Sequence, residues 1–86
     1  MDQLQRYRGQ IDRIDAEIIR LIARRFRVVK KIARLKQDRD LPMLDKKRQR
    51  THSDALAAQA RALGLDPKLV RNVYEEIHRS ALKMKP

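Results

Sequence analysis

The chain has 86 residues, no cysteine, and a formal net charge of +11 from 22 Lys and Arg against 11 Asp and Glu. This length forms one small domain, residues 1–86, and one Phe with two Tyr supplies little bulky material for a core, so we expect partner chains. The lack of cysteine excludes disulfides, thiol nucleophiles and cysteine-based zinc sites. No stretch is long and apolar enough to span a membrane and no signal-peptide pattern occurs, which predicts a cytoplasmic protein without membrane contact.

The positive charge indicates an anionic ligand, which could be nucleic acid, an acidic membrane surface or a small polyanion. Aromatic residues that could stack on bases are almost absent, and no helix of a known DNA-reading motif is recognisable. Both observations argue against nucleic acid as the main ligand. Many of the Lys and Arg side chains are equally well explained as a solvated basic surface.

The segment from Leu4 to Gln37 is predicted to be one long helix, with Asp2 as its N-cap. Its inward positions follow the alternating steps of three and four residues that are typical of a coiled-coil seam. They are Arg8, Ile11, Asp15, Ile18, Ile22, Arg25, Val29, Ile32 and Lys36. Such a helix is about 50 Å long, whereas a compact globule of this size is about 30 Å across. We therefore expect it to overhang its own domain and to pair with a second chain.

The remaining chain is predicted to contain a loop and two shorter helices. Asp40 and Pro42 break the apolar register, which places a loop at residues 38–44. Asp45 is the predicted N-cap of a second helix that ends at Gly64, and Asp66 followed by Pro67 begins a third helix that extends to Met84. The predicted fold class is therefore all-α, with three helices per chain in an intertwined antiparallel homodimer.

Three cations on the inward stripe of the long helix need an explanation, because burying an unpaired Arg or Lys is costly. They could pair inside the bundle, for example with Asp15, or extend to solvent at the edge of the stripe. They could fix the register of the helices. They could also line a pocket that accepts an anion.

Helix geometry supports the pocket. Arg25 and Lys36 are eleven residues apart, which returns to nearly the same face about 16 Å along the axis, so both can reach one small ligand. Arg8 lies about 25 Å before Arg25, too far to share that ligand within one chain, but an antiparallel partner helix would bring its own Arg8 to the site. Arg48, on the inward face of the second helix, could close the site, with Ser80 and Met84 of the third helix as a lid.

The run Arg8-x-x-Ile11-Asp12-x-Ile14-Asp15, followed by Arg24-Arg25, Lys36, Pro42 and Asp45-x-x-Arg48, resembles the all-helical class of chorismate mutase. The resemblance covers nearly the whole chain and includes the order of the helices. It implies a homodimer that converts chorismate to prephenate by an intramolecular Claisen rearrangement in the shikimate pathway of aromatic amino acid biosynthesis. It implies no cofactor and no metal.

The resemblance also implies roles for individual residues. Arg8 of one chain would join Arg25 and Arg48 of the other around the two carboxylates, and Lys36 would donate to the ether oxygen as its bond breaks. Asp45 would hold the substrate hydroxyl through its backbone, and Ser80 would lie at the carboxylate end. A pericyclic reaction needs positioning and electrostatic stabilisation, which Arg and Lys provide, rather than a nucleophile or a general base. Arg25 and Lys36 are the expected catalytic residues.

Two positions depart from the pattern of the family. Gln49 stands where many members have a Glu that contacts the hydroxyl, and Met84 stands where Gln or Glu usually contacts the ether oxygen. A thioether cannot donate a hydrogen bond, and losing one donor to a developing oxyanion costs roughly 3 kcal/mol of barrier. Lys36 could act alone, Lys83 or Lys85 could replace the donor, the substrate could differ, or the enzyme could be weak or inactive.

Two alternatives stay open at this point. One is a sister activity on isochorismate or 4-amino-4-deoxychorismate. The other is a basic helical dimer that binds nucleic acid or an acidic partner without catalysis. His52 and His78 lie on different helices without partners at metal-ligand spacing, so we interpret both as core or surface histidines.

Overall fold

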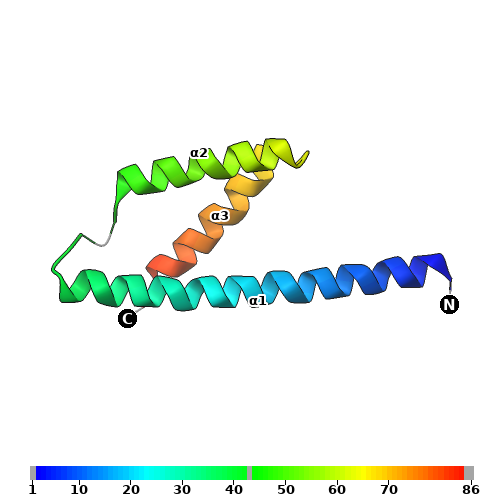
Figure 1. Cartoon of the computed structure of the whole chain (residues 1–86), viewed down its shortest axis with the longest axis horizontal. Coiled ribbons are helices and arrows are strands. Elements are labelled where there is room, and N and C mark those ends of the chain that lie inside the picture. Colours follow the sequence, from blue (N-terminus) through cyan, green and yellow to red (C-terminus); the bar gives the residue numbers. More distant parts are fainter. Residues whose placement is uncertain (1, 43, 85–86) are drawn as a thin grey trace.

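The computed structural model describes residues 2–42 and 44–84, and within these ranges the chain is three α-helices joined by short connections. They are α1 (Gln3–Asp38), α2 (Lys46–Ala62) and α3 (Pro67–Leu82). No strand occurs in the described ranges. The all-α prediction and the order of one long and two shorter helices are confirmed (Figure 1).

Each helix begins at an aspartate whose carboxylate accepts a hydrogen bond from a backbone N–H of the first turn. The donors are Gln5 for Asp2 (2.8 Å), Arg48 for Asp45 (3.0 Å) and Lys68 for Asp66 (2.9 Å). All three predicted N-caps are therefore confirmed. A cap of this kind contributes about 1 kcal/mol, and its negative charge also favours the positive end of the helix dipole.

The end of α2 follows the predicted glycine motif. The N–H of Leu65 donates to the carbonyl of Ala60 (2.8 Å), and the N–H of Gly64 donates to the carbonyl of Arg61 (3.2 Å). These two bonds define a Schellman motif, which requires a left-handed residue just after the helix. Gly64 has a φ of 74° and meets this requirement without a steric penalty.

The end of α1 uses the same motif with a less suitable residue. The N–H of Leu41 donates to the carbonyl of Lys36 (2.8 Å), and the N–H of Asp40 donates to the carbonyl of Gln37 (3.2 Å). Asp40 therefore occupies the left-handed position, with a φ of 54°. The predicted break at this point is confirmed, and its cause is local backbone geometry in addition to Pro42.

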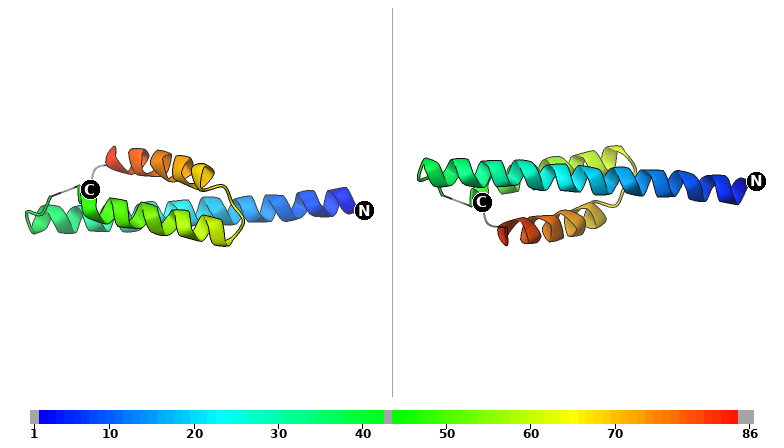
Figure 2. Two further views of the ribbon diagram at one scale, coloured as in Figure 1. Left: turned by 90° about the horizontal axis from the view of Figure 1, so that it is seen from above. Right: turned by 90° about the horizontal axis from the view of Figure 1, so that it is seen from below.

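The long helix extends well beyond the other two. The pair α2 and α3 packs more closely together than either helix packs on α1. In both views of Figure 2 the amino-terminal half of α1 projects without another helix beside it. The chain spans 57 Å along its longest axis, and its radius of gyration is 16.5 Å, against about 12 Å for a compact chain of this length. The predicted overhang is confirmed.

The chain has almost no core of its own. Among the described residues only Ala60 is buried, with 2% of its surface exposed. The large apolar residues on the projecting half of α1 are between 48% and 67% exposed, and they are Leu4, Tyr7, Ile11, Ile14, Ile18, Ile19 and Leu21. Among the helices of the described ranges, none is long and apolar enough to cross a lipid bilayer.

The face of α1 that looks toward α2 and α3 differs from the predicted stripe. Its half-buried residues are Ile22, Arg25, Phe26, Val29, Ala33 and Lys36. The predicted stripe included Ile32, which is 46% exposed, and missed Phe26 and Ala33. A helix that faces two others presents a wider apolar face than a seam with a single partner.

We predict that Asp40→Gly stabilises the protein by about 1 kcal/mol, because glycine adopts the left-handed conformation without strain and the change removes a carboxylate from the negative end of α1. The matched variant is Gly64→Ala. An added Cβ there meets nothing within 4 Å, so its expected loss of about 1 kcal/mol is purely conformational. Urea unfolding at fixed protein concentration measures both changes. An unchanged or lower stability of Asp40→Gly would show that the Asp40 carboxylate itself stabilises this turn.

Candidate functional site

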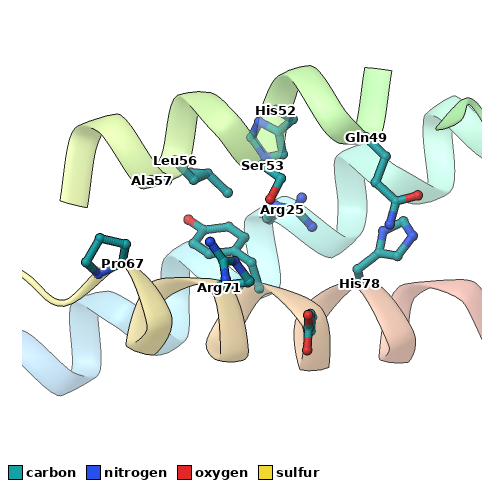
Figure 3. Close-up of a pocket in the computed structure, with 11 residues that line it drawn as sticks. Arg25, Gln49, His52, Ser53, Leu56, Ala57, Pro67, Arg71 and His78 are labelled. Carbon is teal, nitrogen blue, oxygen red and sulfur yellow. The ribbon is translucent and has the colours of Figure 1, made fainter. Parts of the chain in front are cut away.

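A cavity of about 160 Å³ lies where α2 faces α3, and Arg25 reaches it from α1 (Figure 3). The helix α2 contributes Gln49, His52, Ser53, Leu56 and Ala57, and α3 contributes Pro67, Arg71, Tyr74, Glu75 and His78. Along each helix these residues recur at steps of three or four positions, with some adjacent pairs, which places them on one face. One face of each of the two shorter helices therefore lines the cavity, together with Arg25.

Arg25 is the cation at the centre of this arrangement. It is half-buried, and its guanidinium carbon lies 5.6 Å from the centre of the Tyr74 ring. A guanidinium at this distance from an aromatic ring makes a favourable cation–π contact. The single ion pair within the described residues joins Arg79 to Glu76 at 2.8 Å on the surface of α3. The pairing of Arg25 with Asp15 is therefore not observed.

His52 lies beside the same tyrosine. The two rings meet edge to face, with centroids 6.1 Å apart and planes at 86°. Burial lowers the pKa of His52, and the positive charges of Arg48 and Arg25 lower this pKa further. The imidazole is therefore neutral at neutral pH, although it lies among groups that attract anions.

His78 lines the opposite side of the cavity. Its Nε2 atom is buried and has no hydrogen-bond partner among the described residues. Figure 3 shows the side-chain amide of Gln49 directed toward the His78 ring. This end of the cavity therefore presents polar atoms that face each other from α2 and α3.

The structure brings some of the predicted site residues together. Arg25 and Gln49 line the cavity, and Arg48 lies close enough to influence the charge of His52. Lys36 is half-buried on α1, eleven residues beyond Arg25 and on nearly the same face of the helix. Asp45 is the N-cap of α2, and its carboxylate accepts a hydrogen bond from the N–H of Arg48. The backbone of Asp45 therefore lies at the start of that helix.

Of the eight predicted residues, only Arg25 and Gln49 are among the described residues that line the cavity, whereas Arg8, Lys36, Asp45, Arg48, Ser80 and Met84 are not. Arg8 lies on α1 in a shallow groove with Arg6 and Arg13, and seventeen residues of continuous helix separate it from Arg25 within one chain, as predicted. Ser80 is exposed on α3. A single chain therefore presents only part of the predicted site at this cavity.

The placement of Met84 on the third helix is wrong, because α3 ends at Leu82 and Met84 follows its C-cap Lys83. Met84 is half-buried there. Lys85, a candidate to replace the missing donor, lies outside the described residues.

Sequence reasoning did not identify His52 or Tyr74 as residues of the site. His52 follows Arg48 by four positions, which places both on one face of α2, and this spacing was available from the sequence. The contact of Tyr74 with Arg25 joins two helices that are far apart in the chain. Local patterns carry no signal for it.

The fold and the sequence both match known proteins. Residues 7–85 match the family model described as chorismate mutase type II. The structure superposes on a chorismate mutase (Form II) from Thermus thermophilus with a TM-score of 0.86 and 30% identity, covering 96% of this chain and 93% of that one.

Two curated relatives are similar over most of the chain. A 4-amino-4-deoxychorismate mutase of Streptomyces venezuelae is 32% identical over 76 residues, which are 88% of this chain and 74% of that protein. A T-protein of Haemophilus influenzae is 27% identical over 81 residues, which are 94% of this chain but 22% of that protein. The family match over nearly the whole sequence, together with the shared three-helix fold, shows that this chain belongs to the chorismate mutase type II family of isomerases.

Proposed function

We propose that the chain forms a single mutase domain that rearranges chorismate to prephenate. The observation that carries this proposal is the environment of Arg25. It is half-buried at the cavity, its guanidinium lies against the Tyr74 ring, and it forms no ion pair within the described part of the chain. A half-buried guanidinium whose partner is an aromatic face still has its N–H groups available for a carboxylate.

The reaction needs little from the protein beyond positioning and charge. One bond between the ring and the ether oxygen breaks while a new carbon–carbon bond forms, so no proton or electron leaves the substrate. Holding the flexible substrate in its compact conformation removes part of the barrier. In our proposal Arg25 and Arg48 hold the carboxylates, and Lys36 donates to the ether oxygen, where negative charge develops.

The other predicted residues complete the site. We assign the substrate hydroxyl to Gln49 and to the backbone at Asp45, and the carboxylate end to Ser80. Gln49 lines the cavity, and Asp45 begins the same helix, which supports their joint assignment. Met84 is the weakest part of the site, because a thioether offers no donor to the ether oxygen.

We further propose a homodimer with antiparallel α1 helices. The exposed apolar stripe on the projecting half of α1 and the single buried residue Ala60 among those described support it, because a second copy would cover that stripe. In this arrangement Arg8 of the partner subunit reaches the cavity of the first chain. Each dimer then has two equivalent sites, and both chains contribute to each site.

Chorismate is our first choice of substrate over its 4-amino analogue. Gln49 is neutral, and Arg25, Arg48 and Arg71 place positive charge in and around the cavity, which disfavours a protonated amino group. Glu75 is the one carboxylate among the described residues that line the cavity. The similarity to a 4-amino-4-deoxychorismate mutase makes the amino analogue the second candidate. A comparison of kcat/KM for the two substrates decides between them.

We predict that the purified protein converts chorismate to prephenate, and that Arg25→Ala and Lys36→Ala each lower kcat/KM by about 10²–10³ through loss of a fixed cation. Consumption of chorismate with identification of the product measures this. The matched controls are Arg27→Ala and Lys31→Ala on the exposed side of α1, and both keep activity. If the wild type leaves chorismate, isochorismate and 4-amino-4-deoxychorismate unchanged, the catalytic proposal is wrong. Steep salt-dependent binding to nucleic acid would then favour the non-catalytic alternative.

A second prediction tests the shared site. Arg8→Ala and Lys36→Ala should each be inactive alone, because each destroys both sites of its homodimer. After the two variants are unfolded together and refolded at equal amounts, about a quarter of the wild-type activity should return, since half of the dimers are mixed and each has one intact site. A mixture that stays inactive, while size-exclusion chromatography shows dimers, would contradict the contribution of Arg8 across the interface.

A third prediction concerns Met84. Met84→Gln supplies the missing donor and should raise kcat tenfold or more, since about 1.4 kcal/mol corresponds to a factor of ten. Met84→Leu is the matched control, because it keeps the size and apolar character of methionine without a donor, and it leaves kcat near the wild-type value. An unchanged or lower kcat for Met84→Gln would show that Met84 does not face the ether oxygen.

A further inference from the structure

His52 occupies a place in the cavity that the proposed reaction does not use. It comes from α2 one turn after Arg48, and its ring lies edge to face on Tyr74, the same ring whose face holds Arg25. Two of the cations that we assign to the carboxylates therefore lie near one ionisable imidazole. An imidazole is the side chain whose charge responds most readily to such neighbours near neutral pH.

The charges around His52 come from all three helices. Arg25 approaches from α1, Arg48 lies on α2 itself, and α3 contributes Arg71, Tyr74, Glu75 and His78 to the same cavity. Burial and the two arginines lower the pKa of His52. Without an anion nearby, a third positive charge at this point is unfavourable, and the ring stays neutral at pH 7.

We propose that His52 is a further ligand-binding residue of this site, neutral in the free protein and protonated when a dicarboxylate occupies the cavity. The inference rests on the proposed function in one respect, namely that the ligand carries two carboxylates held near Arg25 and Arg48. Those carboxylates offset the field of both arginines and add negative charge beside the imidazole. Both effects favour the protonated ring.

This arrangement couples the ligand to a proton. If binding raises the proton affinity of His52, then protonation of His52 strengthens binding by the same factor, because linkage is reciprocal. Proton uptake accompanies binding, and the affinity for a dicarboxylate increases as the pH falls through the range in which bound His52 titrates. A neutral ligand gains nothing from this coupling, so His52 adds selectivity for anions.

The experiment follows the two histidines by NMR as a function of pH, in the free protein and with malonate, a dicarboxylate that cannot react. We expect malonate to raise the pKa of His52, because its two carboxylates add negative charge near the imidazole ring. Calorimetry should show the dissociation constant of malonate falling about threefold or more from about pH 8 to about pH 6. His52→Gln should abolish this pH dependence, and a dependence that is lost only in His78→Gln would assign it to the other histidine of the cavity.

Two results would overturn the inference. They are an unchanged His52 resonance at the highest malonate concentration, or a pH dependence that survives in His52→Gln. The proposed function is tested independently of this inference. A protein that consumes no chorismate but shows the shift of His52 keeps this inference and loses the mutase assignment, while an active mutase without the shift does the reverse.

Discussion

The structure depends on one constraint, which is that a helix of 36 residues cannot be covered by the rest of a chain of 86. The helices α2 and α3 reach only the carboxyl-terminal half of α1, and a single described residue is buried. Apolar surface contributes about 25 cal/mol for each Å² removed from water, and the projecting half of α1 leaves much of its apolar surface exposed. A second copy that covers the projecting half would supply the missing burial.

The second important feature is the choice of partner for Arg25. A carboxylate next to Arg25 would satisfy it in the protein but would compete with an anionic ligand for the same N–H groups. The Tyr74 ring offsets part of the cost of burying the charge by a cation–π contact and occupies none of those donors. The Tyr74 ring thus holds the guanidinium in place, and its N–H groups remain available to an anion. The same ring contacts His52, so the cation and the imidazole share one support.

The residues that begin and end the helices were predictable from the sequence, and the contacts between helices were not. The three aspartate caps and Gly64 were predicted because each depends on a few neighbouring residues with one backbone requirement. The predicted apolar stripe on α1 was too narrow. The pattern of a seam between two helices does not include Phe26 and Ala33, which are half-buried because α1 faces two other helices. The contact between Arg25 and Tyr74 depends on how α3 is placed relative to α1. Local sequence patterns do not encode that placement. Helix propensity extended α3 to Met84, whereas the helix ends at Leu82.

The projecting half of α1 has a consequence for how the chain can change. Arg8 lies on the same uncovered segment as the apolar residues that need a partner. If the dimer forms as we propose, folding, association and substrate binding all depend on residues in these few turns of helix. In such a dimer, a substitution there would act on the neighbouring chain as well as on its own, so its effects on stability and on the reaction could not be separated. The segment would then tolerate few changes, even though it lies furthest from the cavity of the chain that carries it.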